Sequence, residues 1–324
     1  MKLVYNDSTH SYVIDNKRRA KSVTAVAKIV PDNFALEQWS LRQVAIGMTL
    51  DQSLTERVAA DIGNREMVNQ VCQDAKAAAG ANQAATRGSQ RHRATELLDT
   101  GGNLLTDQQR KDAEVWRRTL DVHGMLIDPN RVEGFVMWPE HGVCGRYDRI
   151  AWYDGRPVMV DLKSGANAVR YPQSVSVQLA LYAYAPMTSA SIAVDGDRST
   201  VTEWVGHDDS LDLDKGYVIL LEDGKELGEL YEINIRHGWA GAQQALDIVD
   251  WRKAHNYGSG LAKKIEPPKT PDGDQLIKAI ESTQTEQGLL QLWRAAKDQG
   301  LWTDRATQAA KQRKTELTKV AKGN

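Results

Sequence analysis

The chain has 324 residues, of which 41% are hydrophobic and 26% charged, as in an ordinary globular protein. The formal net charge of -2 excludes a protein covered in positive charge, so contact with nucleic acid would need a local basic patch. The two cysteines, Cys72 and Cys144, are too few for a disulfide framework, a four-cysteine zinc site or a cysteine-bound iron–sulfur cluster. We expect a protein of a reducing cytoplasm, because no segment has the apolar length of a signal peptide or membrane span.

The first third of the chain is predicted to be mostly helical. Two short β-prone runs, 3–5 and 11–14, flank a turn sequence and predict a small hairpin. Ser22 has the chemistry of a helix N-cap ahead of a short apolar run. The helical part is predicted to cover 22–123, with further helices at 36–48, 65–79, 88–98 and 106–123.

The pattern changes at residue 131, where short runs rich in β-branched and aromatic residues predict strands. The predicted strands are 132–138, 146–153, 158–163, 191–194, 201–205, 217–221 and 230–235. Helices are predicted at 174–184 and 239–255. Helices around a small mixed central sheet make an α/β (α+β) core, which we place at 131–256.

A Gly- and Pro-rich stretch at 257–273 predicts a linker between a domain at 1–256 and a helical tail at 274–324. In the tail, helices are predicted at 275–281, 289–299 and 303–320. Leu289, Leu292, Trp293 and Ala296 have the spacing of one helix face. From Arg305 onward there are six basic residues and one acidic residue.

One predicted hairpin carries the most informative polar residues. Asp148 lies on its first strand, and Asp161 and Lys163 lie on the second, after a turn at Asp154-Gly155. Residues two apart on a strand leave the same face, so the hairpin can gather two carboxylates and an ammonium. This set suits metal-assisted phosphodiester hydrolysis with Mg²⁺ or Mn²⁺, with one or two ions, and the backbone carbonyl of Leu162 is an additional candidate ligand.

The hairpin belongs to an ordered set of four motifs, which are Gly88…His92, Gly145-Arg146-Tyr147-Asp148, Asp161-Leu162-Lys163 and Gln178-Leu179-Ala180-Leu181-Tyr182. This ordered set resembles the PD-(D/E)XK nuclease superfamily, and in particular its RecB-like branch. The Ser22-Val23-Thr24 segment and the helix with Trp39 and Arg42 resemble the corresponding segments of phage-encoded exonucleases, which are related to the CRISPR-associated RecB-type nucleases. The resemblance covers roughly residues 1–256 and implies a restriction-endonuclease-like fold. The chain lacks the four cysteines of the cluster-containing relatives, so no iron–sulfur cluster is expected.

The resemblance assigns roles to the motif residues. His92 would be a metal ligand or a phosphate contact, Asp148 and Asp161 the main metal ligands, and Lys163 the catalytic lysine. Gln178 and Tyr182, four apart on one helix face, would orient the substrate backbone or the water. Glu96, one turn from His92, and Glu133, on the strand before the hairpin, are weaker candidates for groups that support the metal ligands. Weaker candidates for DNA contacts are Arg87, Arg91, Arg93, Arg146 and Arg170.

Together these features predict a metal-dependent DNA exonuclease that acts in phage recombination, replication or host-DNA degradation, in the host cytoplasm if phage-encoded. A structure-specific endonuclease and a non-catalytic DNA-binding protein with a nuclease fold are the alternatives. DNA is the expected partner. The tail either docks a partner, such as a single-strand annealing protein, or extends the DNA contact through its basic end, and a packing appendage that stabilises the core is the alternative. A homo-oligomer is compatible with the sequence, and no membrane partner is expected.

Overall fold

The structure is a computed structural model that describes residues 1–190, 192–255, 260–262 and 273–322. The chain forms two compact units, Met1–Tyr257 and Gly258–Asn324, and each is considered by itself. Most of the predicted linker at 257–273 and the first residue of the predicted strand 191–194 lie outside the described residues. No helix in the described part of the chain is both long and apolar enough to cross a bilayer.

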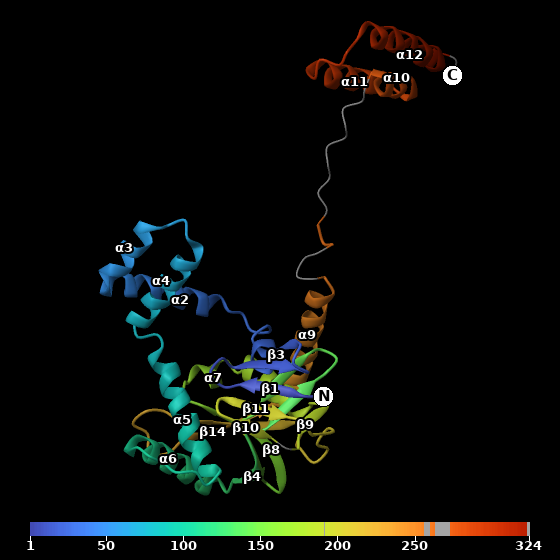
Figure 1. Cartoon of the computed structure of the whole chain (residues 1–324). Helices are drawn as coiled ribbons and strands as arrows, with labels where there is room; N and C mark the ends of the chain where they lie inside the picture. The colour runs from blue at the N-terminus through green and yellow to red at the C-terminus, as the bar shows by residue number, and fades with distance from the viewer. Residues whose placement is uncertain (191, 256–259, 263–272, 323–324) are drawn as a thin grey trace. The chain divides into compact units, whose positions relative to one another are not determined.

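The first unit contains a five-stranded sheet in the order β14-β13-β8-β7-β4. Its strands β14, β8 and β4 are labelled in Figure 1. Its strands are β4 (Leu126–Val132), β7 (Arg149–Tyr153), β8 (Arg156–Lys163), β13 (Lys215–Leu220) and β14 (Glu229–Asn234). β8 and β13 are parallel and the other pairs antiparallel, so the predicted small mixed sheet is confirmed. The β7–β8 turn is at Asp154 and Gly155, both of which have positive φ.

Helices cover both faces of this sheet. One face packs against α1 (Val23–Ala27), α8 (Gln173–Ala183) and α9 (Ile235–Ala254), and the other packs against α6 (Asp107–His123). α5 (Gln83–Asp99) lies beside α6. The alternation along β8 explains the division, because Val158 and Val160 pack on the α6 side while Met159 packs on the α8 side. The α/β fold class is therefore confirmed.

A second, nine-stranded sheet was not predicted as a unit. Its order is β10-β11-β1-β2-β3-β6-β5-β9-β12, and β3 and β6 are its parallel pair. The strands are β1 (Leu3–Asn6), β2 (Ser11–Ile14), β3 (Arg18–Ser22), β5 (Phe135–Trp138), β6 (Val143–Arg146), β9 (Met187–Ser189), β10 (Ala193–Asp195), β11 (Arg198–Val201) and β12 (Trp204–Val205). The predicted N-terminal hairpin is its β1–β2 pair, and Leu3, Tyr5, Phe135 and Met137 form its core.

Two predicted strands, 132–138 and 146–153, are each wrong as single strands, because the chain changes sheet within them. The first divides into β4 and β5, and the second into β6 and β7. The two crossings run side by side, since Glu133 N donates to Asp148 O at 2.8 Å and Tyr147 N donates to Gly134 O at 2.9 Å. Gly134 is required there, because a Cβ at this position would lie 2.2 Å from the Tyr147 hydroxyl oxygen. Glu133 and Asp148 therefore meet where both segments leave one sheet for the other.

The remaining helices of this unit form a small group before α5. α2 (Phe34–Leu50), α3 (Gln52–Ala60) and α4 (Arg65–Ala78) lie together (Figure 1). They share a core of Leu54, Val71 and Ala75. α2 passes very close to α4 at Gly47, where a Cβ would lie 1.8 Å from the carbonyl oxygen of Ala75. α3, which begins after the N-cap Asp51, was not predicted, and neither was the one-turn helix α7 (Asn167–Arg170) after β8.

The second unit consists of α10 (Gly273–Ser282), α11 (Glu286–Asp298) and α12 (Asp304–Lys322), which confirms the three predicted tail helices. Their core includes Leu276, Ile280, Leu289, Ala296 and Ala306. Trp293, predicted to share the face of Leu289 and Ala296, instead lies outside this core and is 36% exposed.

Candidate active site

The β8 strand presents Asp161 and Lys163 on the face that packs against α8, as strand alternation predicts. Lys163 Nζ lies 2.5 Å from Asp161 Oδ2, and the Asp161 residue is only 1% exposed. The carboxylate is therefore held almost out of water at the end of the strand, while the Lys163 side chain is 24% exposed.

α8 brings Gln178 and Tyr182 to the same place. Gln178 Nε2 donates to Asp161 Oδ1 at 3.4 Å and to the Tyr182 hydroxyl at 3.3 Å. Tyr182 fits because Gly145 has no side chain: a Cβ there would lie 2.6 Å from Tyr182 Cε1. The first glycine of the Gly145–Asp148 motif thus makes room for the last residue of the Gln178–Tyr182 motif.

Asp148 is fixed at the crossing between the sheets. Its Oδ2 accepts a hydrogen bond of 2.9 Å from the Leu162 amide and lies 3.3 Å from His92 Nδ1. His92 reaches it from α5, one turn after Gly88. A Cβ on Gly88 would lie 2.8 Å from Ser164 Oγ, so this glycine lets α5 approach the end of β8. The four motifs that are spread over residues 88–182 in sequence therefore converge in one site.

Glu133 completes a group of possible metal ligands. One ligand atom from each of His92, Glu133 and Asp148 lies within 4.8 Å of the others. Sequence reasoning treated Glu133 as a weaker candidate, because its proximity to Asp148 depends on the paired crossings. Asp161 is not in this triad, and it stays a prediction as a metal ligand, as does the Leu162 carbonyl.

The sequence pattern of the PD-(D/E)XK nuclease superfamily matches residues 35–204, more than half of the chain. The protein belongs to the PD-(D/E)XK nuclease superfamily. The match spans α2 to β12 and so includes all four motifs, whereas β13, β14, α9 and the second unit lie beyond it. Among curated proteins, none matches the chain.

The donor set fits the divalent ion that superfamily nucleases use. Carboxylate oxygens and imidazole are suitable ligands for Mg²⁺ or Mn²⁺, and His92, Glu133 and Asp148 supply them within one small space. In addition, the buried Asp161 Oδ2 pairs with the Lys163 ammonium and has no other hydrogen-bond partner in the described part of the chain. A buried carboxylate oxygen with spare acceptor capacity is what a nearby cation would satisfy.

Burial and neighbouring charges set the protonation of these groups differently. Burial disfavours the Asp148 carboxylate, but His92 and then Lys163 outweigh this and lower its pKa. Burial raises the pKa of Asp161 despite the Lys163 ammonium, and burial together with the Asp148 carboxylate raises the pKa of Glu133 to about 8. Three neighbouring carboxyl groups with such unequal proton affinities are typical of a catalytic centre.

Lys163 and Tyr182 keep their protons in this environment. Burial disfavours the Lys163 ammonium, but the Asp161 and Asp148 carboxylates outweigh this and raise its pKa. These carboxylates therefore hold Lys163 as a charged ammonium rather than as a free base. Burial raises the pKa of Tyr182 well above its ordinary value, so it remains a neutral phenol that can donate one hydrogen bond.

Arg149, which sequence reasoning missed, anchors the site from the opposite face of β7. It is fully buried and lies 2.5 Å from Asp99 Oδ2 and 2.7 Å from Thr95 Oγ1, with its guanidinium 4.7 Å from the centre of the Trp116 ring. Trp116 Nε1 also donates to Asp99 at 3.0 Å. Because Asp99 and Thr95 lie on α5 and Arg149 directly follows Asp148, this network holds α5 and its His92 against the start of β7, next to Asp148.

Most of the arginines proposed as DNA contacts have protein partners. Arg87 pairs with Asp112 at 2.5 Å and Asp223 at 3.0 Å. Arg91 is buried and contacts Asp223 and, at 2.7 Å, the Leu221 carbonyl. Both guanidinium groups would have to exchange these partners before contacting a phosphate.

The other proposed DNA contacts differ in exposure. Arg93 is 59% exposed and pairs with Glu96 at 2.9 Å. Arg146 is more enclosed and lies 2.8 Å from Glu133 and 3.7 Å from Glu96, so Glu96 and Arg146 border the ligand triad. Arg170 lies on α7 with its guanidinium 5.5 Å from the Tyr171 ring. Arg93 and Arg170 are thus the freer candidates for DNA contact.

Proposed function

We propose that the protein is a metal-dependent DNA exonuclease of the RecB-like branch that cleaves phosphodiester bonds to leave a 5′-phosphate and a 3′-hydroxyl. The observation that carries this proposal is the convergence of four sequence motifs, from α5, the sheet crossing, β8 and α8, on one buried polar site. Membership of the PD-(D/E)XK superfamily supports the nuclease chemistry. The resemblance of the same motifs to phage exonucleases supports the finer assignment.

The ligand triad of His92, Glu133 and Asp148 would hold a Mg²⁺ or Mn²⁺ ion, with Asp161 facing the same site. When bound, such an ion lowers the pKa of a water and neutralises charge on the scissile phosphate. The protein has to place that phosphate and exclude competing water, and the burial of the site serves both needs.

The remaining side chains have distinct tasks around the phosphate. The Lys163 ammonium, held by Asp161, is placed to donate hydrogen bonds to a non-bridging phosphate oxygen and to orient the attacking water. The Gln178 amide bridges Asp161 and Tyr182, and so orients the carboxylate and leaves the neutral phenol available to the substrate backbone. Arg93 and Arg170 are our candidates for contacts to neighbouring phosphates.

We place the activity in phage DNA recombination, replication or host-DNA degradation within the host cytoplasm. A single-strand annealing protein is the proposed protein partner, because an exonuclease that resects one strand produces the single strand that such a protein coats. An exonuclease needs a DNA end, and this requirement separates it from a structure-specific endonuclease.

The test is digestion of end-labelled linear DNA, single- and double-stranded, beside covalently closed circular DNA, with Mg²⁺, with Mn²⁺ and with EDTA. The proposal predicts cleavage of linear DNA with either ion, no cleavage in EDTA, and intact circles. Asp161→Asn should abolish cleavage, whereas Asp154→Asn, on the exposed turn of the same hairpin, should not. Cut circles would show an endonuclease, and binding of DNA without turnover in either ion would show a non-catalytic DNA-binding protein.

A further inference from the structure

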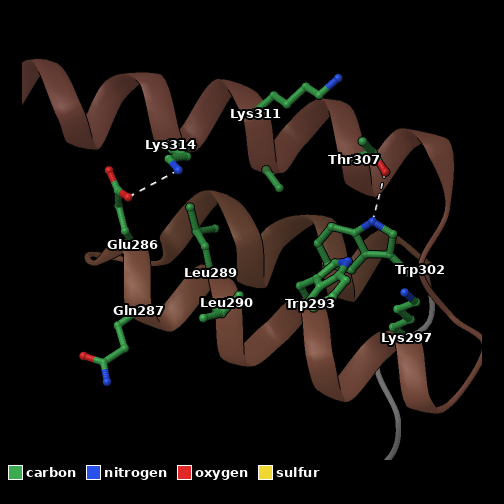
Figure 2. A pocket seen from close by; sticks show the side chains of 11 residues that line it. Glu286, Gln287, Leu289, Leu290, Trp293, Lys297, Trp302, Thr307, Lys311 and Lys314 are labelled. Carbon is green, nitrogen blue, oxygen red and sulfur yellow. Dashed lines mark hydrogen bonds and ion pairs between the residues drawn. The ribbon is translucent and has the colours of Figure 1, made fainter.

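The second unit contains a groove of about 950 Å³ between α11 and α12 (Figure 2). Apolar side chains of α11 and the two tryptophans form its floor, and lysines stand along its edges, as Figure 2 shows. The residues that matter for its chemistry are Glu286, Leu290, Trp293, Lys297, Lys311 and Lys314. None of them belongs to the nuclease motifs, and the groove lies beyond the residues that match the superfamily.

Leu290 and Trp293 are the apolar anchors of the groove. They are 46% and 36% exposed, and neither belongs to the buried core of the unit. With Glu286 and Lys297 they recur at helical spacing along one stripe of α11. A leucine and a tryptophan that are exposed side by side leave apolar surface in water, where it does not stabilise the fold. Such paired apolar side chains are typical of protein-binding surfaces.

The edges of the groove carry unbalanced positive charge. Lys314 pairs with Glu286 at 3.4 Å, whereas in residues 273–322 no carboxylate forms an ion pair with Lys297 or Lys311. Lys297 Nζ instead lies 4.8 Å from the centre of the Trp293 ring. The imbalance extends to the whole unit, because residues 258–324 contain 12 basic and 8 acidic residues, a formal charge of +4, while the rest of the chain carries -6.

We propose that this groove binds an acidic amphipathic segment of a partner protein, with apolar side chains on Leu290 and Trp293 and carboxylates facing Lys297 and Lys311. A groove between two helices suits an amphipathic helix, whose apolar face presents anchors at the same spacing as α11. The charge of the edges selects an acidic segment over a basic one. This inference stands apart from the proposed nuclease activity, since no catalytic residue takes part in it.

Single-stranded DNA fits the groove less well. Such sites stack successive bases on several aromatic rings along a positive channel. Residues 258–324 contain only two aromatic residues, Trp293 and Trp302. The Trp302 ring packs on the core and its Nε1 donates to Thr307 at 2.9 Å (Figure 2), so its position is fixed by the fold.

The test uses the full-length protein and a displayed library of random peptides of about 16 residues, long enough for four helical turns. We expect enriched peptides to combine apolar residues at helical spacing with aspartate and glutamate. For a labelled enriched peptide, Trp293→Ala should weaken binding at least about tenfold in fluorescence anisotropy, as for a typical anchor residue. Lys311→Glu should weaken it several-fold and reduce its salt dependence.

Arg294→Glu and Val320→Ala are the matched controls, because both residues are exposed on α11 and α12 outside the groove and should leave binding unchanged. Circular dichroism of each variant checks that the helices remain folded. The proposal is overturned if no acidic amphipathic peptide is enriched, or if enriched peptides bind wild type and Trp293→Ala equally. It is also overturned if a thymidine oligonucleotide of about 20 residues, measured in EDTA, loses affinity in Trp293→Ala and Lys311→Glu but not in Arg294→Glu.

Discussion

Replacing Arg149 by methionine should destabilise the nuclease unit strongly, because it removes one partner of a buried ion pair. Arg149 is 0% exposed, and its partner Asp99 has a side chain only 5% exposed at 2.5 Å. Removing one member of such a pair leaves an uncompensated buried charge, which costs about 3–5 kcal/mol of the free energy of unfolding. In Arg149→Met/Asp99→Leu, the main remaining loss is the acceptor of the Trp116 indole N–H, about 1–3 kcal/mol. The double variant should therefore be more stable than the single one.

Urea unfolding at 25 °C gives the free energies of unfolding of the single and the double variant from the midpoints and slopes of their transitions. The sign of the pH dependence provides a second check. Burial raises the pKa of Asp99 even with Arg149 present, and without Arg149 it should rise further. The folded single variant then binds a proton that the unfolded chain releases, so its stability falls as pH rises. The free energy of unfolding that it loses relative to wild type should therefore be smaller near about pH 5 than near about pH 8.

The functional readout is the affinity of the single variant for Mn²⁺, because Arg149 holds α5, which carries His92, close to Asp148. The single variant should bind Mn²⁺ more weakly under conditions in which it is still folded. A loss of stability below about 1 kcal/mol, or a double variant less stable than the single one, would refute the role assigned to this network.

Four further variants test other parts of the nuclease unit. Gly145→Ala should cost about 1–3 kcal/mol in urea unfolding and lower the cleavage rate, because its Cβ would overlap Tyr182. Mg²⁺ affinity measured by calorimetry should increase with pH up to about 8, since Glu133 must lose a proton before it binds a cation, and Glu133→Gln should remove this dependence and weaken binding. Arg87→Met should lower stability by about 1–3 kcal/mol, whereas Arg93→Met should change it by less than about 0.5 kcal/mol and flatten the salt dependence of DNA binding.

For each of these expectations, one result would contradict the role assigned to the residue. Full activity in Gly145→Ala would mean that Tyr182 has no required position. A pH dependence of Mg²⁺ affinity that persists in Glu133→Gln would assign it to another carboxylate. Equal stability of the Arg87 and Arg93 variants would mean that the Asp112 ion pair contributes nothing measurable.

The local chemistry of the site could be predicted from sequence because it follows strand and helix periodicity. Asp161 and Lys163 are two apart on one strand, and Gln178 and Tyr182 are four apart on one helix, so each pair had to share a face. The sequence assigned no role to the motif glycines, and only the structure shows that Gly145 makes room for Tyr182.

The parts that sequence could not predict depend on contacts between distant segments. A run of β-prone residues gives no sign that the chain leaves one sheet for another, so Glu133 could not be placed beside Asp148. The Glu133-Gly134 step, where a strand meets a glycine, was the available signal. Arg149 was missed for a similar reason, because an arginine on a strand is usually exposed, and its partners Thr95 and Asp99 lie about fifty residues earlier.

The most direct test of the account is the initial rate at which Asp148→Asn cleaves end-labelled linear DNA in Mg²⁺, compared with wild type and with Asp154→Asn. Asp148 contacts His92 and the Leu162 amide at the centre of the site, whereas Asp154 lies on the exposed turn of the same hairpin. Metal-assisted charge stabilisation supplies several kcal/mol, so Asp148→Asn should lose at least about a hundredfold in rate while Asp154→Asn keeps the wild-type rate. Wild-type cleavage by a folded Asp148→Asn protein would contradict the assignment of this site as the nuclease centre.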